Sequence, residues 1–128
     1  MDQTLVLKTA EFKKALKGLS EALAEKKTDI VRDSVIKRFE YTYELAWKNS
    51  KVFLSEHFGL DFFSPKEVFR SLRSNDLLND EETEALLAMV DDRNLIIHTY
   101  SEDFSEEIYQ KIKDSYFPLF NKISEFLK

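Results

Sequence analysis

The chain has 128 residues, of which 43% are hydrophobic and 34% charged, and its formal net charge is −5 at pH 7. This composition fits one globular domain and excludes a disordered or membrane-embedded chain. With no cysteine and two histidines, the chain lacks disulfides, thiolate metal sites and the ligands for a zinc site, so we expect no cofactor. Because the net charge is negative, any contact with RNA must be confined to a patch.

Two features bear on the expected location of the protein. No apolar run approaches the roughly 18 residues of a membrane span. The opening residues 1–4 lack the basic and then apolar pattern of a signal peptide. We therefore expect a cytoplasmic protein that does not bind a membrane.

Hydrophobic residues recur at helical spacing along two N-terminal segments. Residues 4–25 predict a first amphipathic helix, although Gly18 within it costs about 1 kcal/mol. After a polar turn at residues 26–29, a second and longer helix is predicted to end at Gly59. Its hydrophobic stripe comprises Ile36, Phe39, Tyr43, Ala46, Trp47, Phe53 and Leu54.

Three further helices are predicted in the C-terminal half. The segment Ser64-Pro65-Lys66-Glu67 is a capping box with proline at the first helical position, which predicts a short third helix. Asp80 can cap a fourth helix that continues towards Tyr100. The hydrophobic stripe of that helix is predicted to include Leu86, Val90, Arg93 and Ile97. Residues 101–105 interrupt the pattern, and Pro118 is expected to kink the fifth helix that follows.

The order of these segments predicts the fold class. No segment alternates with period two, so the chain is predicted to be all-α. Short links between long amphipathic helices favour antiparallel neighbours. We predict a single domain over residues 1–128, folded as an up-and-down antiparallel four-helix bundle with an additional short helix.

Polar residues at a defined spacing lie late in the predicted fourth helix. Residues 91–100 read Asp-Asp-Arg-Asn-Leu-Ile-Ile-His-Thr-Tyr, which places Arg93, His98 and Tyr100 in a pattern that resembles the signature of HEPN proteins. Asn94, directly after the arginine, is a polar residue typical of that signature. Residues 38–48 are similar to the second-helix signature of the nucleotidyltransferase substrate-binding family, and residues 64–70 to a third block of it. The blocks stand in order across nearly the whole chain.

The resemblance implies a homodimer that pairs with a minimal nucleotidyltransferase in a toxin–antitoxin system. Some members of the family are metal-independent endoribonucleases that are silenced when the partner adenylylates the motif tyrosine. Carried over by position, Arg93 would hold the scissile phosphate of RNA, His98 would transfer a proton and Tyr100 would be adenylylated. Asn94 and Asp92 would contribute to substrate binding. Other members are known only as substrate-binding subunits, so a non-catalytic subunit is the alternative function.

The residue types suit RNA cleavage without a metal. Arginine stays charged and binds phosphate oxygens bidentately, and histidine takes and returns a proton near neutral pH. On an ideal helix Arg93 and His98 point roughly 140° apart, whereas Arg93 and Tyr100 fall on nearly one face. Either the helix ends or distorts near His98, or two copies related by a twofold axis build the site together.

Each motif residue also has a structural interpretation. Arg93 could pair with acidic residues about one turn away on its own helix. His98 could interact with the dipole at the end of the fourth helix, and Tyr100 could be a core aromatic. Asp91 and Asp92 diverge by about 100° on a helix, so we reject a magnesium site between them.

The remaining aromatic and histidine residues are given structural roles. Phe39, Tyr43 and Trp47 are predicted to pack in the core rather than stack on nucleic-acid bases. His57 lies beside Gly59 and is predicted to belong to the end of the second helix. The chain holds 11 Phe, 5 Tyr and 1 Trp, more than a small bundle readily hides, which favours a homodimer.

Overall fold

A computed structural model of the chain describes residues 3–99 and 101–127. The first four helices are α1 (Gln3–Ala24), α2 (Asp29–Phe58), α3 (Pro65–Ser74) and α4 (Asp80–His98). A continuous helical segment then comprises α5 (Glu102–Lys111), the π-helical turn η1 (Ile112–Tyr116) and α6 (Phe117–Phe126). No strand occurs in these two ranges, so the predicted all-α class is confirmed.

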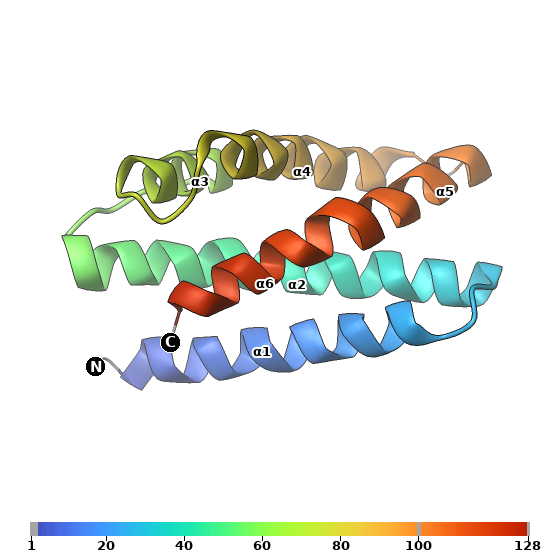
Figure 1. Ribbon diagram of the computed structural model, residues 1–128, viewed down its shortest axis with the longest axis horizontal. Helices are drawn as coiled ribbons and strands as arrows, with labels where there is room; N and C mark the ends of the chain where they lie inside the picture. Colours follow the sequence, from blue (N-terminus) through green and yellow to red (C-terminus); the bar gives the residue numbers. More distant parts are fainter. Residues whose placement is uncertain (1–2, 100, 128) are drawn as a thin grey trace.

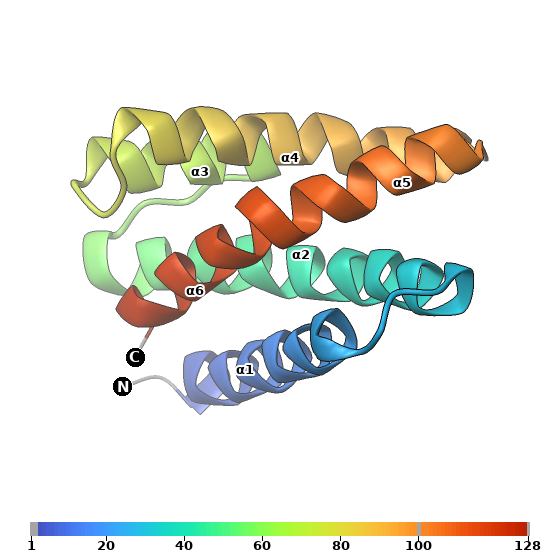
Figure 2. The ribbon, with the colours of Figure 1, turned by 45° about the vertical axis from the view of Figure 1, so that its right-hand side comes forward.

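The long helices form an up-and-down bundle. Helix α1 lies antiparallel to α2, and α4 runs antiparallel to α2 on the side away from α1 (Figure 1). The segment from α5 to α6 crosses α2 obliquely and brings the end of α6 beside α1. In the turned view, α1 and α4 again lie on opposite sides of α2 (Figure 2). The prediction of four long helices with a short additional helix, α3, is confirmed.

Local capping explains the ends of α2 and α3. The Thr28 hydroxyl accepts a hydrogen bond from the Val31 amide at 3.1 Å at the start of α2. Gly59, with a φ of 65°, ends α2 in the left-handed conformation that glycine adopts without strain, as predicted. Ser64 caps α3, also as predicted, by accepting from the Glu67 amide at 3.3 Å. These bonds depend on residues within one turn, so a local pattern is enough to predict them.

The predicted cap of α4 is wrong by one residue. Asn79 is the cap: its side chain accepts from the Glu82 amide at 2.8 Å, and Glu82 accepts from the Asn79 amide at 2.9 Å. This reciprocal pair satisfies two amides that a helix start leaves without partners. Asp80 instead forms an ion pair with Arg73 of α3.

The predictions for the last helix need two corrections. The break at residues 101–105 is shorter than predicted, because Ser101 caps α5 by accepting from the Phe104 amide at 3.1 Å. The irregularity expected at Pro118 lies one turn earlier, in η1, where the Phe117 amide reaches back to the Ile112 carbonyl. Pro118 itself falls in the first turn of α6. The wider turn accommodates a proline that has no amide hydrogen to donate.

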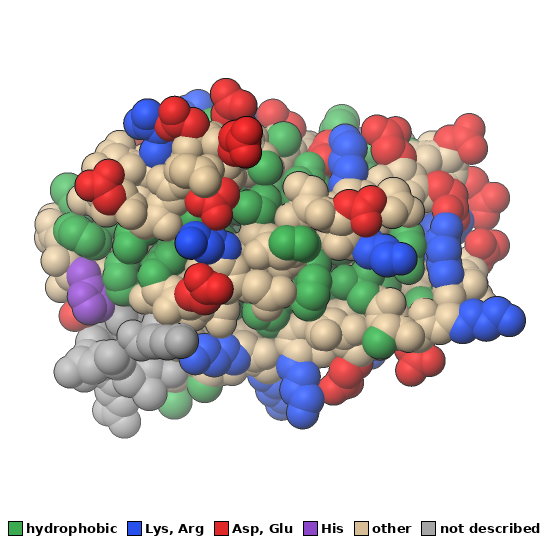
Figure 3. Space-filling view, in the orientation of Figure 1, with side chains coloured by type: hydrophobic (Ala, Val, Ile, Leu, Met, Phe, Trp, Pro, Cys, Tyr) green, Lys and Arg blue, Asp and Glu red, His purple; other side chains and the backbone are tan. Residues whose placement is uncertain are grey.

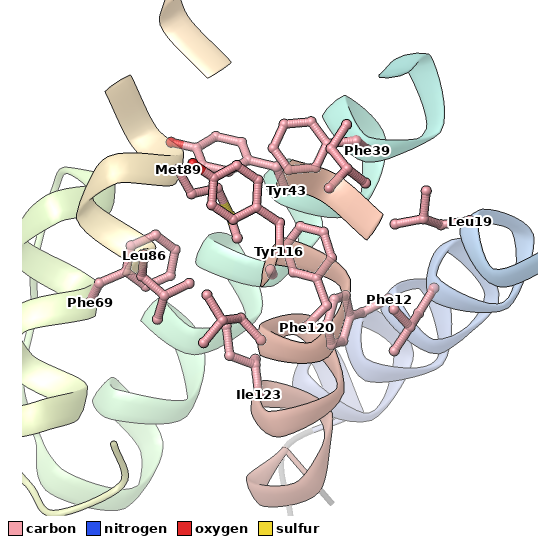
Figure 4. Close-up of a cluster of buried hydrophobic side chains, with 14 of the residues drawn as sticks. Phe12, Leu19, Phe39, Tyr43, Phe69, Leu86, Met89, Tyr116, Phe120 and Ile123 are labelled. Carbon is pink, nitrogen blue, oxygen red and sulfur yellow. The ribbon is translucent and has the colours of Figure 1, made fainter. Parts of the chain in front are cut away.

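Aromatic side chains from α1, α2, η1 and α6 meet along the bundle axis (Figure 4). Phe39 is fully buried, with its ring centre 5.6 Å from that of Tyr116 and 5.8 Å from that of Phe120. Tyr43 is buried and Trp47 packs partly buried against this core. The prediction that the α2 stripe is core is therefore confirmed.

The predicted stripe of α4 departs from the structure in its last turns. Leu86 and Val90 are buried as predicted, but Ile97 is 46% exposed and Ile96 packs against the core instead. From Met89 the buried side of α4 continues through Asp92 to Ile96, at steps of three and four residues; this average is shorter than the 3.6 residues of an ideal turn, so the buried side rotates away from Ile97.

The surface shows where charge accumulates. On the face formed by α5, η1 and α6, hydrophobic side chains lie along the middle, and acidic side chains gather over the end where α5 begins, at the right in Figure 3. At the other end of the bundle, the His57 ring stacks on Phe53 in the last turn of α2, with ring centres 4.2 Å apart. Within the described ranges, no helix combines the length and apolar character that crossing a membrane requires.

Candidate functional site

Arg93 extends from α4 towards α2. Its Nη2 atom lies 3.4 Å from Oε1 of Glu44, and its guanidinium carbon lies 5.7 Å from the ring centre of Tyr43. Its Nε atom is buried and has no hydrogen-bond partner among the described residues. The predicted alternative of an ion pair along α4 is therefore wrong, because the acidic partner is on another helix. The Arg93 side chain is 26% exposed, so its Nη groups, rather than the buried Nε, are the donors that a bound phosphate could use.

The Arg93 side chain lines an open groove, which we call the Arg93 groove. It has a volume of about 570 Å³ and is bounded by α1, α2 and α4. Its lining residues are Glu11, Lys37, Glu40, Tyr41, Glu44, Leu45, Lys48 and Arg93. Carboxylates and cations are equal in number here, and most of them come from one face of α2.

Tyr43 and Glu44 define the electrostatics around Arg93. Burial raises the pKa of Tyr43 to about 12, and the charge of Glu44 adds to the increase. The Tyr43 hydroxyl therefore stays protonated at neutral pH. The guanidinium of Arg93 lies over the ring of Tyr43. Glu44 also lies 3.2 Å from Nζ of Lys48, so one carboxylate is shared by two cations.

Asp92 points away from the Arg93 groove and into the bundle. It is 8% exposed and accepts hydrogen bonds from the Tyr116 hydroxyl and, at 3.4 Å, from Nζ of Lys111. Burial, followed by the bond to Asp92, raises the pKa of Tyr116. Asp91 instead pairs with Lys66 of α3 at 2.8 Å. The two neighbouring carboxylates thus contact different elements, and Asp92 ties α4 to η1.

The other predicted site residues lie apart from Arg93. His98 is the last residue of α4 and is exposed, and Asn94 is exposed one position after Arg93. Neither lines the Arg93 groove. Tyr100 lies outside the described residues. Because α4 stays helical through His98, Arg93 and His98 remain roughly 140° apart around its axis. One copy of the chain does not bring their side chains together.

A second arginine, Arg32 of α2, is held quite differently. Its side chain is 6% exposed and lies 3.0 Å from Glu106 and 3.4 Å from Glu102, both of α5. It also lies 3.1 Å from Asp33 and 3.5 Å from Asp29 of its own helix. We call these five residues the Arg32 cluster. It joins the start of α2 to the start of α5.

No sequence pattern marks Arg32 or Glu44 as a functional residue. Glu44 lies within the segment that resembles the second-helix signature, and its spacing from Lys48 indicates only a pair along α2. Likewise, the positions of Asp29 and Asp33 near Arg32 in the sequence indicate only ion pairs along α2. The partners on α4 and α5 become visible only when the helices pack. No group of three or more acidic or histidine side chains within residues 3–99 and 101–127 is arranged to hold a metal ion.

Comparison with known proteins gives a family match over residues 7–128, to a family described as nucleotidyltransferase substrate binding protein like. A search of curated proteins finds no match. Among solved structures, a protein from Thermus thermophilus is 41% identical, with a TM-score of 0.86 over 91% of this chain and 98% of that one.

Two less similar structures share the fold. One is a tri-AMPylated HEPN toxin from Shewanella oneidensis in complex with an MNT antitoxin: it is 20% identical, with a TM-score of 0.77 over 98% of this chain and 96% of that one. The other is a toxin–antitoxin with AMP-PNP, also 20% identical, with a TM-score of 0.78 and full coverage of both chains. The family match spans α2, α3 and α4, where the resembling motifs lie, and the chain belongs to the nucleotidyltransferase substrate binding protein like family.

Proposed function

We propose that the protein is the HEPN subunit of a toxin–antitoxin pair, and that its partner is a minimal nucleotidyltransferase. The family match supports the link to a nucleotidyltransferase. The likeness in fold to a HEPN toxin bound to an MNT antitoxin supports the pairing. The test of partnership is co-purification of the chain with a nucleotidyltransferase encoded beside it, and separate elution of the two proteins would contradict the proposal.

The activity we propose is metal-independent cleavage of RNA. The observation that carries it is Arg93, whose partly exposed guanidinium lines an open groove and pairs with one carboxylate, that of Glu44, among the described residues. In the reaction, the ribose 2′-oxygen attacks phosphorus and the bond to the 5′-oxygen breaks, which yields a 2′,3′-cyclic phosphate and a 5′-hydroxyl. Arg93 would neutralise the charge on the phosphorane oxygens. His98 would accept the 2′-hydroxyl proton and then deliver it to the leaving 5′-oxygen, so that one histidine serves each site.

The cleavage site would require two copies of the chain. Arg93 and His98 diverge on α4, so a twofold axis near its C-terminal end would place Arg93 of one copy beside His98 of its partner. Leu95 and Ile97 support this arrangement, because they are 49% and 46% exposed in the same part of α4 and a dimer would cover them. Light scattering should then return twice the 15.1 kDa of the chain.

Mixing two inactive variants tests the shared site. Equal amounts of Arg93→Ala and His98→Ala, once subunits have exchanged, should recover about a quarter of wild-type RNA cleavage, because half the dimers then hold one intact pair. Each variant alone should stay inactive and keep its helical circular dichroism. A mixture as inactive as its components would contradict the shared site. If His98→Ala alone cleaves as well as wild type, the ribonuclease proposal is wrong.

We propose Tyr100 as the residue that the partner modifies. In adenylylation, the phenol oxygen attacks the α-phosphorus of ATP, pyrophosphate leaves and the phenol loses its proton. The added phosphate could pair with Arg93 and compete with RNA. Incubation with the nucleotidyltransferase and ATP should increase the mass of wild type by one or more adenylyl groups and decrease cleavage. Tyr100→Phe should show neither change, and a Tyr100→Phe variant that still gains the same mass would exclude this tyrosine.

The second candidate function is that of a non-catalytic substrate-binding subunit. The family description favours it, and so does the Arg93 groove, whose volume of about 570 Å³ falls within the range of small-molecule sites. On this alternative, calorimetry should detect a nucleotide bound to the isolated protein, Arg93→Ala should weaken that binding, and RNA should stay intact.

A further inference from the structure

We infer that the outer face of α2 next to Arg93 binds single-stranded RNA, with Tyr41 as the surface on which an unpaired base stacks. This inference rests on the proposed function and deepens it, because it names the form of the RNA and the residues that hold it. The Arg93 groove forms one part of this face. A second groove, of about 480 Å³, lies between α1 and α2 and forms the other. Both grooves are lined by Glu11 and Tyr41, so they meet at the tyrosine.

The charge of this face is opposite to that of the whole chain. Its cations are Lys14, Lys37, Arg38, Lys48 and Arg93. Its carboxylates are Glu11, Glu40 and Glu44. Five cations against three carboxylates give the face a net charge of +2, and since the whole chain carries −5, the other residues carry −7. A polyanion would therefore be attracted here and repelled from the acidic end over α5 (Figure 3).

Tyr41 lies at the centre of the face and is available to a ligand. Its side chain is 64% exposed, although its neighbours on α2 at positions 39, 42 and 43 are buried. Across the second groove, α1 presents Ala15 and Gly18, whose small size leaves the approach to the ring open. Nζ of Lys37 lies 5.8 Å from the ring centre of Tyr41. When a base covers the ring, that ammonium can turn to the adjoining phosphate.

The combination of an exposed ring and surrounding cations favours a single strand over a duplex or a protein segment. Unpaired bases stack on aromatic side chains while cations follow the backbone, whereas the bases of a duplex are already stacked on each other. Phe63 provides a useful contrast. It is 78% exposed, but its cationic neighbour Lys51 is neutralised by Asp61 at 3.1 Å. Exposure alone therefore does not distinguish the Tyr41 face; the surplus of positive charge does.

The test uses a fluorescein-labelled single-stranded RNA of 2′-O-methyl nucleotides, which the protein can bind but cannot cut. In fluorescence anisotropy, Tyr41→Ala should raise the Kd about tenfold, the effect of removing one stacked base. Tyr41→Phe should bind like wild type because it keeps the ring. Phe63→Ala is the matched control at another exposed aromatic residue and should also bind like wild type.

The salt dependence tests the cations separately. For a single strand, each phosphate that is no longer neutralised by the protein should lower the slope of log Kd against log salt concentration by about 0.7. Lys37→Gln and Lys48→Gln should each produce that decrease. Lys113→Gln, at an exposed lysine of η1 that lines neither groove, should leave the slope unchanged.

Three results would overturn the inference. Tyr41→Ala could bind the single strand as tightly as wild type, or the wild type could prefer the matching duplex. Sedimentation could show that Tyr41→Ala converts a dimer to a monomer, in which case a second copy of the chain covers this face. If instead the wild type binds the 2′-O-methyl strand as expected but leaves unmodified RNA intact, the inference stands and the proposed ribonuclease activity fails.

Discussion

Two of the arginines that join α2 to other helices, Arg32 and Arg93, show how the surroundings of one residue type decide what it can do. Arg32 has four carboxylates within 3.5 Å and its side chain is 6% exposed. Arg93 has Glu44 alone at 3.4 Å, is 26% exposed, and holds an Nε donor without a partner among the described residues. The first is saturated with acceptors, whereas the second is not.

The difference separates a structural ion pair from a candidate ligand site. A guanidinium offers five donors, and Arg32 uses its donors on carboxylates that belong to the fold. An anion would have to displace those carboxylates to reach it. Arg93 is supported by the ring of Tyr43 and held by one carboxylate that Lys48 shares, so a phosphate can approach it from the open groove. Availability, rather than charge alone, makes Arg93 the candidate for ligand binding.

The largest effect is expected at Arg93. Arg93→Ala should lower kcat/KM for RNA cleavage about 100-fold or more, because the charge on the phosphorane loses its fixed cation. Arg93→Lys should restore part of the rate, since a lysine keeps the charge but not the bidentate geometry. Cleavage of a labelled RNA and circular dichroism provide the measurements. Arg32→Gln is the matched control, and an equal loss of cleavage per folded molecule in that variant would remove the distinction between the two arginines.

The next effect concerns the hydrogen bond that Tyr116 donates to Asp92, the residue before Arg93. Tyr116→Phe should lower the free energy of unfolding by about 1–3 kcal/mol, because the buried Asp92 carboxylate loses a donor. Urea denaturation measures the change. Tyr109→Phe, at a second buried tyrosine for which the described residues provide no hydroxyl bond, should change stability less. Equal losses in both variants would show that the bond to Asp92 does not hold α4 in place.

A smaller effect of opposite sign is expected at Gly18, in the groove that adjoins the Arg93 groove. A methyl group at this position would meet Nη1 of Arg38 at 3.7 Å, an ordinary contact. Gly18→Ala should therefore stabilise the fold by up to about 1 kcal/mol through helix propensity. Thermal unfolding tests this expectation. Destabilisation would mean that the packing of α1 on α2 requires a residue without a side chain at position 18. Ala15→Gly provides the reciprocal control on the same helix face.

The smallest effect is the pH response of the Arg32 cluster. Hydrogen bonds from Lys27 and then Arg32 lower the pKa of Glu106 below its ordinary value of 4.5. The stability that Glu106 contributes is thus present above pH 4.5 and is lost as the pH falls through the lowered pKa. Glu106→Gln should make the unfolding free energy less dependent on pH below that value. Glu107→Gln, at the exposed neighbouring position, should keep the wild-type slope, and equal slopes in all three proteins would contradict the assignment.

Sequence alone was sufficient where the deciding contacts are local. Gly59 and Ser64 mark helix ends because the bonds involved lie within one turn of the chain. The α2 stripe was predicted correctly as core because α2 keeps one face towards its neighbours over 30 residues. The predictions failed where two local signals competed. Asn79 and Asp80 are both good capping residues, and the position of Glu82 favours Asn79.

In the candidate site, too, the sequence predicted what depends on local spacing and not what depends on contacts between helices. The motif spacing identified Arg93 and His98 as candidates and showed that one straight helix would aim them apart. It did not indicate that Asp92 would be buried against Tyr116, or that Glu44 would be the partner of Arg93. Those contacts join residues 24 and 49 positions apart in the chain, so no local pattern encodes them. They exist because α4 packs beside η1 and α2, and only that packing decides which guanidinium is neutralised and which still faces an open groove.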